Sequence, residues 1–241
     1  MRILCLILAS DTSPEYIRFQ SMWRLFMRIH PNVDCYFYKG HPNITKDAFV
    51  EDQTLWLKIP DTLETVYEKT LRAFEYFTPM LSKYDYVFRS NLSTFVSFNH
   101  LLEYCKDLPR TNCCAAVIGG IPANDEKRHS LESGFTFPGG NGFLLSPDLV
   151  RRLVEEKVPL VEQDDVTIGV ALRMWGVKIT EFVRPDFRDD GFWLINNYKL
   201  LPPNDRNMNP KKIMFTYRIK SFDRMKDVEV MRSMIQNVYG V

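Results

Sequence analysis

The stretch YDYVFRSNLSTFV, from Tyr84 to Val96, joins a short apolar segment to a polar cluster. Tyr84 to Phe88 is predicted to form a strand, and Arg89 to Ser93 follow it directly. In α/β sheets, ligands bind in the crevice beyond the carboxyl ends of the strands. We therefore interpret this stretch as a central strand that delivers polar side chains to a binding site.

Strand and helix patterns alternate along the remainder of the chain. We expect strands at residues 2–10, 33–38, 55–59, 84–88, 113–118, 142–145, 177–183 and 213–219. We expect helices at residues 13–30, from 61 or 62 to 80, around 101–105, and at 147–157, 164–175 and 223–238. Residues 124–140 are polar and rich in glycine, which predicts a long surface loop. This order predicts an α/β fold with a mostly parallel central sheet and helices on both faces.

The composition is that of one globular domain. Of the 241 residues, 45% are hydrophobic and 25% are charged, which allows a substantial core. Lys and Arg number 31 against 30 Asp and Glu, so the net charge of +1 gives no field that would attract nucleic acid or an anionic membrane. The apolar run from Ile3 to Ala9 is too short to span a bilayer, so no membrane span is expected.

The cysteines and the glycosylation sequons indicate a reducing compartment. The five cysteines include no C-x-x-C pair, which favours free thiols and a cytoplasmic location. N-x-S/T sequons begin at Asn43 and Asn91, and the second lies inside the predicted site. Because a glycan on Asn91 would block that site, the sequons also disfavour secretion.

Three stretches, in this order, carry a family resemblance. They are DTLETVYEKTLRAFEYF (Asp61 to Phe77), the YDYVFRSNLSTFV stretch, and GNGFLLSPDLVRRL followed by DDVTIGVALRMWGV (Gly140 to Leu153, then Asp164 to Val177). Together they resemble the inverting glycosyltransferases of the GT-A fold, a Rossmann-like α/β fold. The similarity is greatest to the β-1,3-galactosyltransferase and Fringe group and to the enzymes of large DNA viruses of the chlorella-virus type.

The resemblance implies one glycosyltransferase domain over residues 1–241. Residues 1–120 would form the nucleotide-sugar-binding half, 121–200 the acceptor and catalytic half, and 201–241 a closing tail. The implied donor is a UDP-sugar, with UDP-xylose and UDP-galactose as candidates. The implied acceptor is an oligosaccharide or the glycan of a glycoprotein, and the implied location is the host cytoplasm if the chain is viral.

The paired acids Asp164 and Asp165 open the helix that bears the catalytic acid in the resembled family. An inverting transfer needs one carboxylate to take the proton of the acceptor hydroxyl. The resemblance assigns this role to Asp165, with Asp164 as its neighbour and the alternative base. The competing interpretation is that both acids only stabilise the positive end of the helix dipole.

Asn91 and Ser93 stand where the resembled enzymes carry the metal-binding Asp-x-Asp motif. Neutral oxygens are poor replacements for two carboxylates around a hard cation. Either a divalent metal, Mn or Mg, binds elsewhere or weakly, or basic side chains stabilise the departing diphosphate in its place. The basic candidates are Lys69, Arg72, Arg89, Arg218 and Lys220, and the last two lie on one side of a predicted strand.

Further residues are assigned to the donor and the acceptor. At the end of the first strand, Ser10, Asp11 and Thr12 are expected to bind the nucleotide sugar, together with Ser90, Asn91 and Ser93, although Asp11 could also stabilise a turn. The resemblance places Asn141, Gly142 and Phe143 beside the sugar and the acceptor, with a core role as the alternative for Phe143. Trp193 offers a flat apolar face of the kind on which sugars stack.

Two other functions compete with the transferase. A nucleotide-sugar-binding or glycan-binding protein of the same fold would lack catalysis because the metal motif is lost. A nucleotidyltransferase shares the alternating architecture, but it would need acidic metal ligands where Asn91 and Ser93 stand. The four histidines have no ligand spacing, so no zinc site is predicted.

Overall fold

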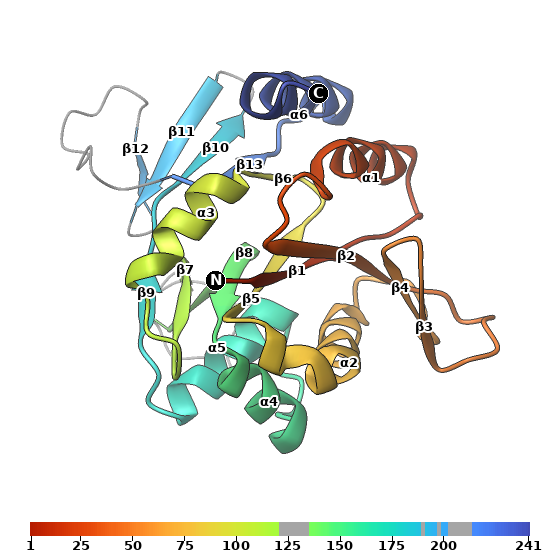
Figure 1. The fold of residues 1–241 in the computed structure, drawn as a ribbon, viewed down its shortest axis with the longest axis vertical. Coiled ribbons are helices and arrows are strands. Elements are labelled where there is room, and N and C mark those ends of the chain that lie inside the picture. Colours follow the sequence, from red (N-terminus) through yellow and green to blue (C-terminus); the bar gives the residue numbers. More distant parts are fainter. Residues whose placement is uncertain (121–134, 189–190, 197–198, 202–213) are drawn as a thin grey trace.

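The first strand, β1 (Ile3–Leu8), lies in the middle of the main sheet (Figure 1). The structure, a computed structural model, describes residues 1–120, 135–188, 191–196, 199–201 and 214–241. Within these residues the sheet has eight strands, in the order β3 (Ala48–Glu51), β4 (Thr54–Leu57), β2 (Val33–Gly40), β1, β5 (Tyr86–Asn91), β8 (Thr136–Leu145), β7 (Cys114–Gly120) and β9 (Ile179–Glu181). Four of its seven strand pairs are parallel and three are antiparallel. The predicted α/β fold is confirmed.

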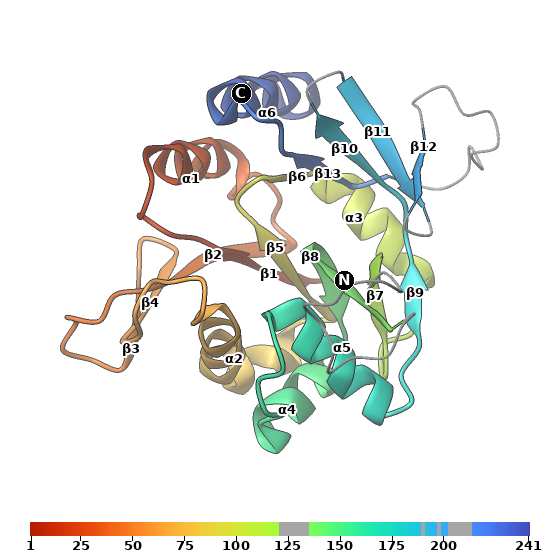
Figure 2. The same ribbon diagram turned by 180° about the vertical axis from the view of Figure 1, so that it is seen from behind.

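Helices cover both faces of this sheet (Figures 1 and 2). Alternate side chains of β1 enter different cores, with Ile3, Cys5 and Ile7 in one and Leu4 and Leu6 in the other. The first core also contains side chains of α1 (Pro14–Phe26), α3 (Phe98–Tyr104) and α6 (Arg224–Tyr239). The second contains those of α2 (Val66–Phe77), α4 (Pro147–Glu156) and α5 (Asp164–Met174). A strand buried on both faces explains the unbroken apolar run at the start of the chain.

A second, smaller sheet lies beside the carboxyl end of β5 and is not predicted by the sequence pattern, apart from its strand in the tail. Its order is β12 (Lys199–Leu201), β11 (Gly191–Asn196), β10 (Arg184–Arg188), β13 (Thr216–Ile219) and β6 (Thr94–Val96). Only the backbone of β11 and β12 is described. Because β6 begins three residues after β5 ends and pairs with β13, the tail of the chain lies directly against the Asn91–Ser93 segment.

The helix that follows β4 begins later than the sequence pattern predicts. We expect a start at Asp61 or Thr62, whereas α2 begins at Val66 with Thr65 as its N-cap residue. The Nζ atom of Lys69 donates to the Asp61 carboxylate at 2.6 Å and to the Thr62 carbonyl at 3.2 Å. These bonds hold the preceding turn against the helix. Asp61 and Thr62, the predicted N-cap residues, therefore accept hydrogen bonds from Lys69 instead of capping the helix.

The predicted loop at residues 124–140 is wrong at its carboxyl end. Residues 124–134 lie outside the described part of the chain, but β8 already begins at Thr136. Phe135 and Phe137 are buried against Val166 of α5, which ties the strand to that helix. Gly139 lets it approach β7, since an added Cβ would lie 2.9 Å from the Val117 carbonyl oxygen. The glycines that indicated a loop therefore serve close packing.

The cysteines agree with the sequence prediction. All five cysteines are buried and free, so the chain contains no disulfide among them. Within the described residues, no helix is long and apolar enough to cross a membrane. The division into residues 1–120, 121–200 and 201–241 stays a prediction.

Candidate active site

A cavity of about 690 Å³ opens at the carboxyl ends of β1 and β5. This is the size and the position expected of a small-ligand site in an α/β protein. Most of the predicted site residues line it, namely Ser10, Thr12, Lys69, Arg89, Asn91, Ser93, Asn141, Asp164, Asp165, Arg218 and Lys220. The lining also contains residues that are not predicted as site residues from the sequence, namely Tyr16, Asp61, Thr62, Leu63, Gln163 and Arg224.

Two predicted nucleotide-binding residues point elsewhere. The Asp11 carboxylate accepts from Lys39 Nζ at 2.7 and 2.8 Å and from Gln20 Nε2 at 2.9 Å, so it is engaged in an ion pair beside the cavity. The side chain of Arg72 lies on the surface of α2, where its Nη1 pairs with the Glu75 carboxylate at 3.1 Å. Neither residue is part of the cavity lining.

The strand residues Ser90, Gly142 and Phe143 belong to the support of the site and not to its lining. Ser90 and Phe143 are fully buried, and Phe143 packs in the core between the sheet and α2, α4 and α5. The position of Phe143 therefore fits the alternative interpretation, in which it is a core residue. A Cβ on Gly142 would lie 2.9 Å from the Phe88 ring. The side chain of Trp193 lies outside the described residues.

The carboxylate of Asp165 lies in the lining at the start of α5. Its Oδ2 accepts from the Gly140 backbone N–H and its Oδ1 from that of Val166, both at 2.9 Å. Burial, followed by the neighbouring Asp164 charge, raises the pKa of Asp165 to about 6, although Arg89 and the two N–H groups act in the opposite direction. A carboxylate with this pKa is a suitable general base at neutral pH.

Asp164 is held in a buried ion pair. Its Oδ2 lies 2.6 Å from Arg89 Nη2, and the two side chains are 4% and 2% exposed. The same oxygen accepts from the Thr70 hydroxyl at 2.9 Å. Burial alone would lower the pKa of Arg89, but the Asp164 carboxylate, with smaller contributions from Tyr38 and Asp165, raises it above its ordinary value. The charge of Arg89 is therefore balanced by Asp164, and Asp165 is the better placed of the two acids to meet a ligand.

Arg89 links the two acids to the strands around them. Its Nη1 donates to the Asn91 amide oxygen at 2.7 Å and also to the Gly140 carbonyl. Since the Gly140 N–H in turn donates to Asp165, Arg89 contacts the residues on both sides of that carboxylate. The arrangement is a closed ring of side-chain and backbone groups that fixes the orientation of Asp165.

The residues at the position of the Asp-x-Asp motif do not fit Mn or Mg. Such a cation is held by oxygen ligands that usually include at least one or two carboxylates. The Asn91 oxygen already accepts from Arg89, and the Asp61 carboxylate is bonded to Lys69. Within the described residues, no three His, Cys, Asp or Glu side chains are grouped so that they could hold a metal ion.

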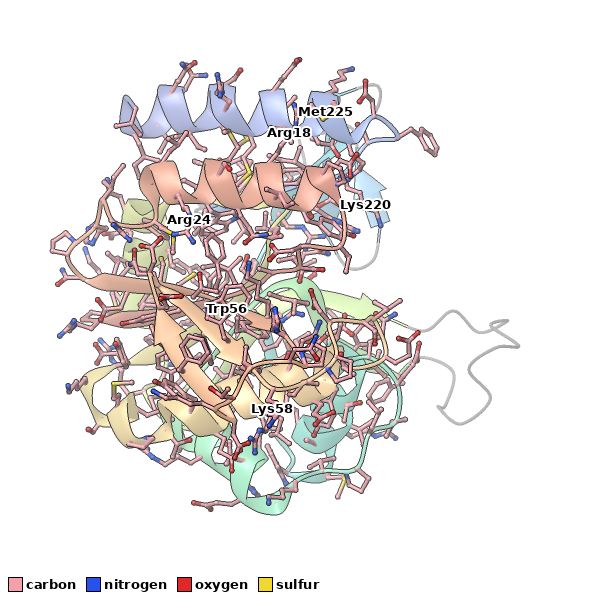
Figure 3. All side chains as sticks on the ribbon, turned by 90° about the vertical axis from the view of Figure 1, so that its right-hand side faces the viewer. Arg18, Arg24, Trp56, Lys58, Lys220 and Met225 are labelled. Carbon is pink, nitrogen blue, oxygen red and sulfur yellow. The ribbon has the colours of Figure 1, made fainter. Side chains whose placement is uncertain are left out.

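The tail supplies basic side chains to the lining of the cavity. The Ile219 N–H donates to the Ser93 carbonyl at 2.8 Å, which fixes Arg218 and Lys220 beside the Asn91–Ser93 segment. Arg218 Nη1 also lies 3.7 Å from the buried Asp186 carboxylate. Lys220 and Met225, the latter in the first turn of α6, lie toward the same end of the stacked helices α1 and α6 (Figure 3).

Basic side chains outnumber acidic ones in this cavity. The described lining holds Lys69, Arg89, Arg218, Lys220 and Arg224 against Asp61, Asp164 and Asp165. Lys69 and Arg89 are paired with Asp61 and Asp164 of the lining, and Arg218 and Arg224 contact Asp186 and Asp227 outside it. Within the lining itself the basic groups are in excess, which favours an anionic ligand that joins these ion pairs.

Arg224 is a lining residue that is not predicted from the sequence, although it ends the stretch FTYRIKSFDR from Phe215 to Arg224, which also carries Arg218 and Lys220. It is the first residue of α6, directly after the N-cap Asp223, and the available signal was this position at the predicted helix start.

The chain is an α/β protein whose cavity at the carboxyl ends of the strands is lined by a carboxylate and by basic side chains. Over 97% of its length, the chain is similar in fold to all of a solved glycosyltransferase involved in the glycosylation of the major capsid of PBCV-1, with a TM-score of 0.51 and 8% sequence identity. The predicted resemblance to glycosyltransferases of this viral type is confirmed at the level of the fold.

A curated human protein shows similarity in sequence. The chain is 32% identical over 107 residues to N-acetyllactosaminide beta-1,3-N-acetylglucosaminyltransferase 2, and the match covers 39% of this chain. The match spans 27% of that protein's length, about a quarter. No family model matches the chain.

Proposed function

We propose that this chain is an inverting glycosyltransferase that moves a sugar from a UDP-sugar to a glycan hydroxyl. The observation that carries the proposal is the juxtaposition, in one cavity, of the Asp165 carboxylate and a wall of basic side chains from the tail. The carboxylate is suited to deprotonate an acceptor, and the basic wall is suited to receive a diphosphate. The likenesses to glycosyltransferases in fold and in part of the sequence support the same function.

In the proposed reaction Asp165 takes the proton of the acceptor hydroxyl. The oxygen of that hydroxyl forms a bond to the anomeric carbon from the face opposite the diphosphate, and the bond from this carbon to the phosphate oxygen breaks. The electron pair of the broken bond leaves with the UDP. The contacts of Arg89 with Gly140 and Asp164, and of Gly140 with Asp165, hold the Asp165 carboxylate in one orientation throughout the reaction. This lowers the entropy cost of the proton transfer.

In this proposal the leaving UDP is stabilised by side chains and not by a metal held at the Asp-x-Asp position. A cation about 4 Å from a phosphate oxygen contributes roughly 4 kcal/mol at an effective dielectric constant near 20. Arg218, Lys220 and Arg224 line the same cavity as Asp165, and Arg218 and Arg224 also contact the Asp186 and Asp227 carboxylates. The Lys69 ammonium group lies in the same lining, paired with Asp61. Candidate donors are UDP-xylose, UDP-galactose and a UDP-N-acetylhexosamine, the last in line with the name of the human relative. The free buried thiols support a cytoplasmic location.

The metal-independent mechanism predicts that donor binding and transfer survive chelation. In a thermal-shift screen, the donor UDP-sugar is expected to raise Tm equally in EDTA and in manganese. The rate of transfer in EDTA is expected to stay within about twofold of the rate in manganese, because the stabilising charges are part of the chain.

Lys220→Ala is expected to weaken UDP binding about tenfold, the loss of one charged hydrogen bond. Arg72→Ala, which removes a surface charge outside the cavity, serves as the matched control.

Loss of all transfer in EDTA, restored by manganese, would contradict the metal-independent mechanism and leave the fold unchanged. A protein that binds UDP-sugars without transferring or slowly hydrolysing any of them would instead be the catalytically silent binding protein. These outcomes can be distinguished by incubating the protein with a UDP-sugar and no acceptor, and measuring the slow hydrolysis of the donor.

The close contact of Gly140 with Asp165 gives a second prediction. A Cβ at residue 140 would lie 2.7 Å from Asp165 Oδ2, so Gly140→Ala must displace the carboxylate from its hydrogen bond. We expect transfer to fall about a hundredfold, the effect of misplacing a reacting group by about 1 Å, with UDP affinity nearly unchanged. Steady-state kinetics and isothermal titration with UDP would measure the two quantities.

Gly176→Ala is the matched control for Gly140→Ala. Gly176 adopts a left-handed φ of +69° and has nothing within 4 Å of an added Cβ, so alanine there strains the backbone without touching the cavity. It is expected to lower stability by about 1 kcal/mol and leave transfer unchanged. Equal loss of transfer in both variants would mean that instability, and not the position of Asp165, explains the effect of Gly140→Ala.

A further inference from the structure

The orientation of the Asn91 amide is fixed by its neighbour Arg89. The distance between Arg89 Nη1 and Asn91 Oδ1 is 2.7 Å. A guanidinium group can donate hydrogen bonds but cannot accept them, so the atom of Asn91 that faces it must be the amide oxygen. The chemistry of the pair therefore settles which end of the amide is the carbonyl.

Asn91 cannot easily reverse this orientation. Arg89 is 2% exposed and is held on its other side by Asp164 at 2.6 Å and by the Gly140 carbonyl. If the Asn91 amide turned over, its NH₂ group would face the buried guanidinium and leave one N–H of Arg89 without an acceptor. An unsatisfied buried donor of this kind is strongly unfavourable. The amide oxygen of Asn91 therefore stays bound to the buried Arg89 guanidinium.

The NH₂ group of Asn91 is consequently the end directed away from Arg89, and Asn91 lines the cavity. Among the described residues, the only hydrogen bond of the Asn91 side chain is the one that its oxygen accepts from Arg89. An NH₂ group donates hydrogen bonds and cannot coordinate a cation. The position that corresponds to a metal ligand thus presents a donor to the cavity, next to the basic wall formed by Arg218, Lys220 and Arg224.

We propose that Asn91 binds the donor substrate directly, its amide NH₂ donating a hydrogen bond to an anionic oxygen of the diphosphate, and that Arg89 is the positioning residue that imposes this polarity. The inference rests on the proposed function, because it names the part of the donor that this residue contacts. It also explains why a neutral amide stands next to a buried arginine. The amide oxygen of Asn91 accepts a hydrogen bond from Arg89 and is not left to bind a metal ion.

The test is the affinity of the wild type and three variants for UDP and for inorganic pyrophosphate, measured in EDTA by isothermal titration. Asn91→Ala removes the donor and is expected to weaken binding of both ligands about tenfold. Asn91→Asp replaces the donor by an oxygen and adds a negative charge next to the diphosphate, so it is expected to weaken binding further than Asn91→Ala. Asn43→Asp makes the same substitution at an exposed asparagine outside the cavity and is expected to have no effect.

The addition of manganese distinguishes the proposal from a weakened metal site. If Asn91→Asp binds UDP more tightly than Asn91→Ala, and does so only with manganese present, the position is a metal site that needs only its carboxylate, and the inference is wrong. Unchanged affinity in both variants would overturn it as well. A melting curve for each variant establishes that the folded protein is being titrated.

The outcomes for this inference and for the proposed function are separable. If the wild-type chain transfers no sugar but binds UDP, and the affinity falls in the order wild type, Asn91→Ala, Asn91→Asp, the proposed catalysis fails and the inference holds. If the chain transfers sugar but the variants bind UDP as the wild type does, the inference fails alone. A wild-type chain that binds neither UDP nor pyrophosphate contradicts both.

Discussion

Replacing Asp165 with asparagine is expected to lower the rate of transfer by about 10²- to 10⁴-fold, the usual contribution of a general base. The substitution preserves the shape of the side chain and one of its two oxygens, so it keeps one of the hydrogen bonds from the Gly140 and Val166 N–H groups and loses the other. The amide cannot take a proton from the acceptor. Donor affinity is expected to change little, because the basic wall and Asn91 are untouched. Rapid-quench kinetics and titration with UDP would separate the two effects.

The pH dependence of transfer gives the same assignment an independent test. Since the pKa of Asp165 is raised to about 6 and the reaction needs its ionised form, the rate is expected to be flat above that pH and to fall tenfold per unit below it. The Asp165→Asn variant is expected to lose this acidic limb. Glu162→Gln, which changes a nearby acid outside the cavity lining, is the control. Near-normal transfer in Asp165→Asn would rule out Asp165 as the base.

Replacing Arg89 with methionine is expected to have the largest effect on stability. It leaves the Asp164 carboxylate, which is 4% exposed, without its charged partner. Leaving one member of a buried pair alone costs about 3–5 kcal/mol, which urea unfolding would measure. Transfer is expected to be lost as well, because the ring that orients Asp165 is opened and the Asn91 oxygen loses its donor.

The double variant Arg89→Met with Asp164→Leu tests the origin of this cost. Replacing both charges by apolar groups is expected to recover most of the stability, as for other buried pairs, without recovering transfer. Arg28→Met is the surface control, since Arg28 and Asp52 are 61% and 63% exposed and such pairs contribute less than about 1 kcal/mol. Recovery of transfer in the double variant would mean that Arg89 and Asp164 do not position the base.

Several features follow from short stretches of sequence. The apolar run at β1 and the 3.6-residue spacing in α2 predict the α/β fold, because burial on one or two faces imposes these periods locally. The acids at the start of α5 and the absence of carboxylates at Asn91 and Ser93 are also visible in the sequence. Where glycines served close packing, as at Gly139, the same local reasoning predicted a loop and failed.

The roles within the candidate site depend on contacts between residues far apart in the chain. The resemblance prefers Asp165 to Asp164, but as side chains the two acids are alike in the sequence. The Arg89 guanidinium of β5 binds Asp164, which leaves Asp165 as the proposed base. The spacing on α2 does not distinguish Lys69 from Arg72. In the structure Lys69 lines the cavity and is paired with Asp61, whereas Arg72 lies on the surface and is paired with Glu75.

The sequence by itself determined that strands alternate with helices and that the metal motif is missing, since both are written in neighbouring residues. The tertiary structure alone decided which side chains surround Asn91 and Ser93. The pairing of β13 with β6 brings Arg218 and Lys220 to the Asn91–Ser93 segment, and Arg89 donates a hydrogen bond to the Asn91 amide oxygen. Charge balance in a buried site is set by distance in space, which no pattern along the chain records.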